Sequence, residues 1–267
     1  MAVKDGSAVP GTSPARTTEA RLGFGIDIGG SGIKGAPVDL ATGEFTAERL
    51  RFATPQPSTP EAVAAFVKQL LDHFGWEGAY GCTLPAVVQH GVARTAANID
   101  PSWIDTDVDK LFEGVTGRNS FLVNDADAAG LAEVRFGAAA GQPGTVIVTT
   151  LGTGIGSALI FDGVLVPNTE LGHLEVDGVD AEKRAASSVK DVEGLSYKHW
   201  ARRLTRYYTV LENLMWPDLF VVGGGVSKDA EKFLPLLEIR TRIVPAALKN
   251  NAGIVGAAVL STERAEA

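Results

Sequence analysis

Asn124 and Asp125 are the two residues whose type and position most directly suggest catalysis. They follow the apolar stretch 121–123, typical of a buried strand, and precede the alanine-rich segment 126–136, which favours a helix. Ligands of an α/β sheet bind at the carboxyl ends of its strands, and a carboxylate there could accept the proton of an attacking hydroxyl group. Alternatively, Asp125 only caps the helix, because Asp is a favoured N-cap residue.

A second polar cluster consists of Glu170, His173 and Glu175, which are spaced among leucines in the sequence ELGHLE. Converging carboxylates, amides and one imidazole suit a ligand with many hydroxyl groups, because every hydroxyl needs donor and acceptor partners. Asn98 and Trp103 would add an amide and an aromatic plate to such a site. A local salt bridge is the simpler interpretation of the charged positions.

Three glycine-rich segments, 27–35, 151–156 and 222–227, follow apolar stretches. Glycine lets backbone N–H groups approach an anion closely and allows the positive φ angles that curl a loop around it. We predict phosphate-binding loops, although a tight turn would explain any one of the segments. The chain has no G-x-x-x-x-G-K-[ST] motif, and 151–156 joins two strands instead of opening a helix, so neither a P-loop nor a hydride-transfer enzyme is indicated.

Asp27 stands at the end of the apolar strand 22–28, directly before the first glycine segment. A carboxylate on such a strand is costly to desolvate unless it is paired or faces a wet cleft. Beside a phosphate loop it would hold a hydrated Mg²⁺ ion, directly or through water. Hydrogen bonding to the glycine turn is the alternative.

The elements that must position these residues recur in the same order in both halves of the chain. The first half predicts strands at 22–28, 33–38 and 44–52, a helix opened by Ser58 and Glu61, a strand at 79–84, an amphipathic segment at 107–115, a strand at 121–123 and a helix at 126–136. The second half predicts strands at 146–150, 157–161 and 164–166, a helix at 195–214, a strand at 219–222, and helices near 229–237 and 252–262.

This repetition predicts an α/β fold of two duplicated β-β-β-α-β-α lobes around a cleft. We expect residues 1–21 to form a mobile tail. The small lobe would comprise 22–124 joined by the C-terminal helix 250–264, and the large lobe 125–249.

The chain of 267 residues has 24 Lys and Arg against 32 Asp and Glu, and its one cysteine is Cys82. The net charge of −8 argues against nonspecific binding to nucleic acid or to an anionic membrane. A single cysteine excludes an intrachain disulfide and a multi-thiolate zinc site. We expect a cytoplasmic protein, because the first 20 residues lack the apolar core of a signal peptide and no apolar run could span a bilayer.

The motifs DIGGSGIKG, NDADAA, LGTGIGSAL, ELGHLEV and VVGGGVS occur in the order found in the ROK sugar kinases. The chain therefore resembles this family of the actin–hexokinase (ribonuclease H-like) superfamily over roughly residues 22–262. The stretch 190–208 resembles in particular its actinobacterial polyphosphate glucokinases and glucomannokinases. The resemblance implies that Asp125 is the catalytic base, that the cofactor is Mg²⁺ and that the protein is a homodimer.

The resemblance also implies roles for other positions. The hexose ligands would be Asn98, Asn124, Asp125, Glu170, His173 and Glu175. The phosphate-binding residues would be Asp27, Gly29, Gly30, Ser31, Gly32 and Lys34 in the first segment and Thr153 and Gly154 in the second, with Gly223, Gly224 and Gly225 in the loop on the adenosine side.

The sequence departs from the family at one place. Many members follow this histidine with a cysteine-rich zinc segment, whereas here the chain continues VDGVDAEKRAAS. We therefore expect no zinc and expect His173 to contact the sugar directly. The family also includes repressors with an N-terminal DNA-binding domain, for which the tail of about 21 residues is too short, so no nucleic-acid partner is expected.

Lys198, Arg202 and Arg206 recur every four residues on the predicted helix 195–214. A basic stripe on an acidic chain would form a track for a polyanion longer than ATP, although a solvated helix face would explain it equally. We predict transfer of the terminal phosphoryl group of polyphosphate, and also of ATP, to the 6-hydroxyl of glucose, with mannose as a second candidate acceptor. The alternatives are a strictly ATP-dependent hexose or N-acetylhexosamine kinase, and a sugar sensor without turnover.

Overall fold

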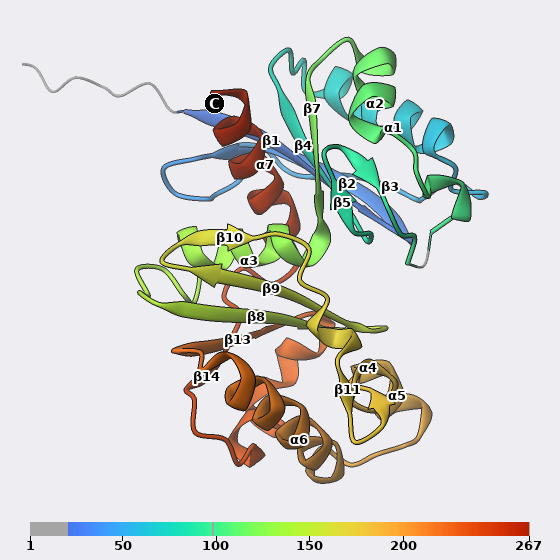
Figure 1. Ribbon diagram of the computed structural model, residues 1–267. Coiled ribbons are helices and arrows are strands. Elements are labelled where there is room, and N and C mark those ends of the chain that lie inside the picture. The colour runs from blue at the N-terminus through green and yellow to red at the C-terminus, as the bar shows by residue number, and fades with distance from the viewer. Residues whose placement is uncertain (1–20, 98, 267) are drawn as a thin grey trace, which may run out of the picture.

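Two five-stranded sheets, which lie one above the other in Figure 1, form the frame of the molecule. The computed structural model describes residues 21–97 and 99–266. The predicted tail, apart from Arg21, and the predicted sugar ligand Asn98 therefore lie outside the described residues. In both sheets an antiparallel meander is extended by two parallel strands, which confirms the predicted α/β fold with a repeated strand pattern.

The first sheet has the strand order β3-β2-β1-β4-β7, in which β1, β4 and β7 are parallel. The strand predicted at 44–52 is shorter than expected, because only its last three residues pair with β2. Pro37 of β2 has no N–H group to continue that ladder, and beyond it a single bridge joins Val38 to Phe45. The strands are β1 (Leu22–Gly29), β2 (Gly32–Asp39), β3 (Leu50–Phe52), β4 (Tyr80–Leu84) and β7 (Ser120–Asn124).

The second sheet repeats this layout in the order β10-β9-β8-β13-β14, in which β8, β13 and β14 are parallel. β14 was not predicted, because its three residues show no alternating pattern and, unlike those of β10, do not follow an Asp-Gly hairpin turn. The strands are β8 (Thr145–Leu151), β9 (Ile155–Phe161), β10 (Val164–Val166), β13 (Leu219–Gly223) and β14 (Ile243–Pro245).

Helices α1 (Pro60–His73) and α2 (Val108–Thr116) bury their apolar sides against the first sheet. The predicted cap of α1 is wrong by one residue, since Thr59 accepts the capping bond from Ala62 N. Ser58 instead accepts, through its carbonyl oxygen, a 2.7 Å bond from Nε1 of Trp103. Trp103 is fully buried in this core, so the prediction of an aromatic plate for a sugar is also wrong.

Two helices cross between the sheets. Helix α3 (Asp125–Phe136) leaves the first sheet and packs on β8 and β9, whereas α7 (Ala252–Ala265) leaves the second sheet and packs on β1 and β4. Close approach requires glycine at Gly25 and Gly81, where a Cβ atom would lie within 2.0 Å of a carbonyl oxygen of α7. At Gly256 a Cβ atom would lie 1.8 Å from the carbonyl oxygen of Ala128. Small residues therefore let each half of the chain seal the sheet of the other.

A long connection between β10 and helix α6 (Tyr197–Met215) breaks the symmetry of the two halves. It carries five short elements: the 3₁₀ helix η2 (Leu171–His173), β11 (Glu175–Val176), β12 (Val179–Asp180), α4 (Glu182–Ala185) and α5 (Ser187–Val192). In the first half the additional elements lie at a different point, between β4 and α2, and are the hairpin of β5 (Val88–Gln89) and β6 (Val92–Ala93), followed by η1 (Pro101–Trp103).

The helix predicted near 229–237 is instead two 3₁₀ segments, η3 (Gly225–Lys232) and η4 (Leu234–Leu236). Pro235 removes a backbone donor there, and Asp229 has non-helical backbone angles. A further 3₁₀ turn, η5 (Lys249–Asn251), precedes α7. No helix in the described part of the chain is both long enough and apolar enough to cross a membrane.

Candidate functional site

A cleft of about 810 Å³ opens between the two sheets, where the carboxyl ends of their parallel strands meet. Both strand-to-strand glycine hairpins, β1–β2 and β8–β9, contribute to its wall. Eleven of the predicted site residues line it: Asp27, Gly29, Gly30, Ser31, Asn124, Asp125, Thr153, Gly154, Glu170, His173 and Gly224. Residues that the sequence places far apart are thus brought to one cavity.

Asn124, and not Asp125, caps helix α3. Its Oδ1 atom accepts bonds from the N–H groups of Ala126 at 2.8 Å and Asp127 at 3.1 Å, and its Nδ2 atom donates to the carbonyl oxygen of Ala86. Asp125 is the first residue of the helix, and its Oδ1 atom accepts one bond from Ala126 N at 2.8 Å. The capping alternative for Asp125 is therefore wrong, and its carboxylate faces the cleft.

The surroundings of Asp125 suit proton transfer near neutral pH. Its carboxylate is open to the cleft but lies among protein atoms on its other sides, and this desolvation raises its pKa. The negative charges of Asp27 and Glu170 act in the same direction, and the pKa of Asp125 is raised to about 6. A base with such a pKa is mostly ionised at pH 7 and still binds a proton well.

Asp27 lies beside Asp125 on the same side of the cleft. Its Oδ2 atom pairs with Nζ of Lys34 at 2.7 Å, and its Oδ1 atom accepts from Thr83 at 2.9 Å. The partners of Asp27 are thus side chains of neighbouring strands and not the glycine turn. Each carboxylate oxygen keeps a second lone pair, so two carboxylates are available to a cation here.

Side chains behind the first hairpin hold its backbone in place. Thr54 donates to the carbonyl oxygen of Gly29 at 2.6 Å, and Arg51 donates to that of Ser31 at 2.9 Å. Gly32 and Lys34 lie outside the cleft lining, in contrast to the other predicted residues of this segment. A Cβ atom at Gly32 would lie 2.7 Å from the guanidinium group of Arg51, so this glycine makes room for that bond.

The second hairpin is held in the same manner. Ser187 donates to the carbonyl oxygen of Gly152 at 3.1 Å, and Ser188 donates to that of Thr153 at 2.6 Å. A Cβ atom at Gly154 would lie 2.3 Å from Oε2 of Glu182, which explains the glycine there. Of the third segment only Gly224 reaches the cleft, with φ of +82°, between Gly223 at the end of β13 and Gly225 at the start of η3.

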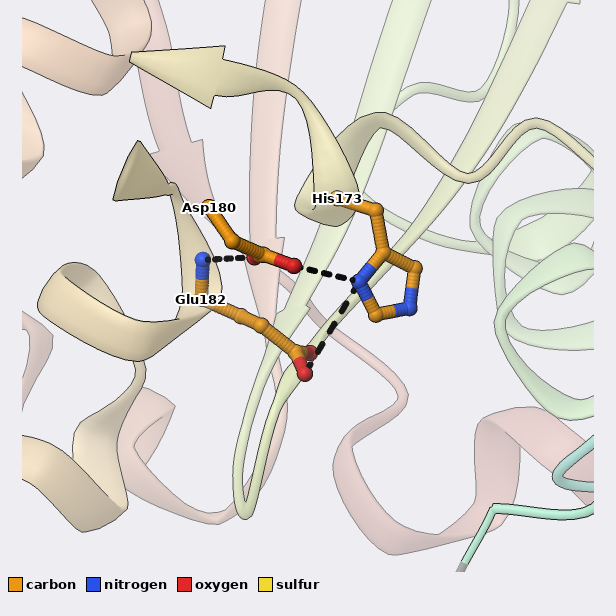
Figure 2. A group of neighbouring side chains, drawn as sticks. All are labelled: His173, Asp180 and Glu182. Carbon is orange, nitrogen blue, oxygen red and sulfur yellow. Dashed lines mark hydrogen bonds and ion pairs between the residues drawn. The ribbon is translucent and has the colours of Figure 1, made fainter. Parts of the chain in front are cut away.

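The connection after β10 supplies the polar groups at the second-sheet end of the cleft. Glu170 and His173 flank the turn η2, and Glu182, which we did not predict, joins them from α4. Figure 2 shows that Asp180 binds Nδ1 of His173 at 3.1 Å through one oxygen and the backbone N–H of Glu182 at 3.1 Å through the other. This hydrogen bond to Asp180 raises the pKa of His173.

Glu175 is exposed on β11 and does not line the cleft, so the prediction of a sugar ligand at this position is wrong. The carboxylate at the cleft is that of Glu182, seven residues later, whose Oε2 atom also accepts from Ile155 N at 3.1 Å. The spacing of the ELGHLE motif favoured Glu175, whereas the hairpin of β11 and β12 reverses the chain and brings Glu182 back to His173. The pair Asp177-Gly178, in which both residues have a positive φ, is a hairpin turn signal that could have predicted this return.

Comparisons with known proteins match residues 23–187 to the ROK family model. The chain is 55% identical over 258 residues to a polyphosphate glucokinase of Mycobacterium tuberculosis (strain CDC 1551 / Oshkosh), covering 96% of this chain and 97% of that protein. This chain belongs to the ROK family. Its predicted membership is therefore confirmed.

Solved structures of ROK-family enzymes superpose on this chain. The inorganic polyphosphate/ATP-glucomannokinase from Arthrobacter sp. strain KM has a TM-score of 0.86 and 52% identity, covering 91% of this chain and 99% of that chain. A ROK family glucokinase from Streptomyces griseus, in complex with glucose and AMPPNP, has a TM-score of 0.77 and 25% identity, covering 91% and 100%.

His173, Asp180 and Glu182 of this ROK-family chain also place their donor atoms within 4.8 Å of one another (Figure 2). One imidazole and two carboxylates are ligands that a divalent metal ion accepts. The 3.1 Å bond between His173 and Asp180 satisfies the same atoms without a metal ion. The absence of the family's cysteine-rich segment after His173 predicts no zinc here, and that remains a prediction.

The three residues of the basic stripe predicted on α6 lie in different surroundings in the structure. Arg206 forms three bonds to Asp177, including one of 2.6 Å, and this ion pair offsets its charge. Lys198 is exposed near the start of the helix and belongs to neither pocket described here. Arg202 lines a second, smaller pocket.

Asp127 is a buried carboxylate that the sequence analysis did not single out. It is 1% exposed, its Oδ2 atom accepts from Asn168 N at 2.7 Å, and its Oδ1 atom has no partner within the described residues. Burial, with the charges of Glu170 and Asp125 in addition, raises its pKa to about 7. Asp127 therefore connects α3 to the loop before Glu170.

Proposed function

We propose that this ROK-family chain transfers the terminal phosphoryl group of inorganic polyphosphate, and also of ATP, to the 6-hydroxyl of glucose, with mannose as a second acceptor. The observation that carries the proposal is the position of Asp125. Its carboxylate, with a pKa of about 6, lies in a cleft between two glycine hairpins of the kind that bind phosphate. The sequence likeness to a polyphosphate glucokinase supports this donor and this acceptor.

Asp125 would act as the general base. The 6-hydroxyl of the sugar would donate its hydrogen bond to the carboxylate, which takes the proton as the oxygen attacks the phosphorus atom in line with the leaving group. No covalent intermediate on the enzyme is needed. Because Asn124 already caps α3, the Asp125 carboxylate is left for this role.

The two hairpins would hold the phosphates. Thr54 and Arg51 fix the carbonyl groups of the first hairpin, and Ser187 and Ser188 fix those of the second, so the loops are held before a ligand arrives. Preorganised amides of this kind stabilise the charge that develops in the transition state. Asp27 would hold Mg²⁺, directly or through water, since this ion prefers one or two carboxylates together with phosphate oxygens, and it would neutralise phosphate charge when bound.

The connection after β10 would recognise the sugar through Glu170, His173 and Glu182. The Nδ1–H group of His173 would donate to Asp180, which leaves Nε2 to accept from a sugar hydroxyl. Since Asp180 also binds the backbone of Glu182, it would orient both residues without touching the sugar.

Closure of the cleft would exclude water, which otherwise competes with the sugar as acceptor. We propose that the moving parts are residues 22–124 with 250–264 on one side and 125–249 on the other. The crossing of α3 and α7, which touch at Gly256 and Ala128, lies where such a motion would occur. A cytoplasmic location, expected from the composition of the sequence, and a homodimeric state, expected from the family resemblance, both remain predictions.

The experiment is to measure sugar-6-phosphate formed from glucose with Mg²⁺ and either ATP or long-chain polyphosphate. Turnover with both donors is expected. Turnover with ATP alone would indicate a strictly ATP-dependent hexose kinase. Faster turnover of N-acetylhexosamines than of glucose would indicate an N-acetylhexosamine kinase. Glucose binding without turnover from either donor would indicate a sugar sensor.

A further inference from the structure

A second pocket, of about 170 Å³, lies outside the cleft on the second half of the molecule. Its wall is formed by α4, α6 and the hairpin of β11 and β12. The polar residues that line it are Asp177, Arg184, Arg202, Arg203, Arg206 and Tyr207. Four arginines thus share a small cavity with one carboxylate, on a chain whose net charge is −8.

The charges in this pocket are not balanced from within the described part of the chain. Arg206 is paired with Asp177, and Arg203 is paired with Glu193 at 2.6 Å. Arg184 and Arg202 have no acidic group within 4 Å among the described residues. Two carboxylates, Asp177 and Glu193, thus face four guanidinium groups, which leaves an excess of positive charge. Guanidinium groups bind phosphate in a bidentate manner.

Tyr207 gives an independent indication that a ligand belongs here. Its side chain is 1% exposed, and its hydroxyl group has no hydrogen-bond partner in the described structure. A buried hydroxyl without a partner is unfavourable, because it has lost water and gained nothing. Tyr207 lines the pocket, and a movement of its side chain that opens the hydroxyl group would let an anion there accept its hydrogen bond.

We propose that the arginine pocket binds phosphate groups of inorganic polyphosphate at a distance from the phosphate that is transferred. This inference rests on the proposed function, because it adds a second binding site for the proposed donor. The pocket is smaller than the roughly 300–1,000 Å³ of sites that enclose a drug-sized ligand, so it suits one or two phosphate groups and not a nucleotide.

The pocket lies close enough to the cleft for one polyanion to reach both. Helix α4 separates them, since Glu182 at its first position lines the cleft and Arg184, two residues later, lines the pocket. A helix is about 10–12 Å across with its side chains, so a long polyphosphate chain can pass around α4, whereas ATP or tripolyphosphate cannot. Two contacts on one chain raise its affinity beyond that of either contact alone.

The test compares Arg202→Gln and Arg184→Gln with Lys198→Gln in the full-length protein. All three variants lose one positive charge at an exposed position, and Lys198 shares α6 with Arg202 but does not line the pocket. The KM for long-chain polyphosphate and for tripolyphosphate is measured at saturating glucose. For the two arginine variants we expect the KM for the long chain to rise roughly five- to tenfold more than the KM for tripolyphosphate. For Lys198→Gln we expect equal KM changes for the two donors.

Two results would contradict polyphosphate binding in the pocket. The first is an equal change in the KM for long-chain polyphosphate and for tripolyphosphate in the arginine variants. The second is a KM for the long chain that rises as selectively in Lys198→Gln as in the arginine variants. If the wild type uses ATP but not polyphosphate, polyphosphate is not a donor and the proposed function is wrong. Calorimetric titration with long-chain polyphosphate then tests separately whether the pocket binds it. Weaker binding to Arg202→Gln than to Lys198→Gln supports the pocket in that case. Equal binding to the two variants contradicts it.

Discussion

The two halves of the chain place different residues at equivalent points of the same strand order. Asp27 stands two residues before the first glycine of the β1–β2 hairpin, and Thr150 stands two residues before that of the β8–β9 hairpin. At the start of α3 the chain reads Asn124-Asp125, and at the start of α7 it reads Asn251-Ala252. The second half thus has a hydroxyl and a methyl group where the first has carboxylates.

This difference indicates how two halves with the same strand order can contribute differently to a reaction between two different substrates. The first half supplies the two carboxylates that handle a proton and a cation, close enough for Asp27 to raise the pKa of Asp125. The second half supplies the long connection after β10, with the polar groups that face the cleft and the arginine pocket behind it. We therefore expect changes in the first half to act on kcat and changes in the connection to act on substrate affinity.

The largest effect is expected from Asp125→Asn. Loss of the base should lower kcat by roughly 10²- to 10⁴-fold, whereas the affinity for glucose should change little because Asn keeps the size of the side chain. Steady-state kinetics and calorimetric titration with glucose measure the two quantities. Near-normal turnover would show that Asp125 is not the general base. It would also contradict the expectation that changes in the first half act on kcat.

The next effect concerns the connection after β10. Glu182→Gln should raise the KM for glucose roughly 10- to 100-fold with a smaller loss of kcat, because a charge-assisted bond to a sugar hydroxyl is weakened. Glu175→Gln is the matched control, since Glu175 is exposed outside the cleft. A larger rise in the KM for glucose in Glu175→Gln than in Glu182→Gln would instead support Glu175 as the sugar ligand.

Asp180 should have a smaller influence through His173 and Glu182. Asp180→Ala removes the acceptor for both groups and should raise the KM for glucose about fivefold. Asp180→Asn keeps an oxygen acceptor and should recover most of the affinity. A charge effect alone would make the Asn variant as poor as the Ala variant, and glucose titration of both variants separates the two explanations.

The smallest effect is one of stability. The pKa of Asp127 in the folded chain, about 7, lies above that of an unfolded Asp, so protonation favours the folded state and stability falls as pH rises toward 7. Between pH 6 and pH 8 this should amount to about 1 kcal/mol. Urea unfolding of wild type and Asp127→Asn at both pH values should show a loss about 1 kcal/mol larger in the wild type, because Asp125, with a pKa of about 6, contributes to the loss in both proteins. An equal pH dependence in both proteins would contradict the assignment.

The sequence predicted the repeated strands, the glycine hairpins and Asp125 because each depends on a local pattern of alternation, turn residues or a strand-to-helix junction. It missed Glu182 because the ELGHLE spacing favoured Glu175, although the turn residues Asp177-Gly178 mark the hairpin that returns the chain to His173. It also placed Trp103 at the site, whereas packing against α2 and a bond to Ser58 bury it. Contacts between segments far apart in the chain are not visible in local spacing.

The central claim is that one carboxylate, at the start of α3, serves both phosphoryl donors. The most direct test is the rate of glucose-6-phosphate formation by wild type and Asp125→Asn, with ATP and with long-chain polyphosphate in parallel. The account predicts that both rates fall by the same factor in the variant, while glucose binding is retained. A loss confined to one donor, or to neither, would contradict a shared base.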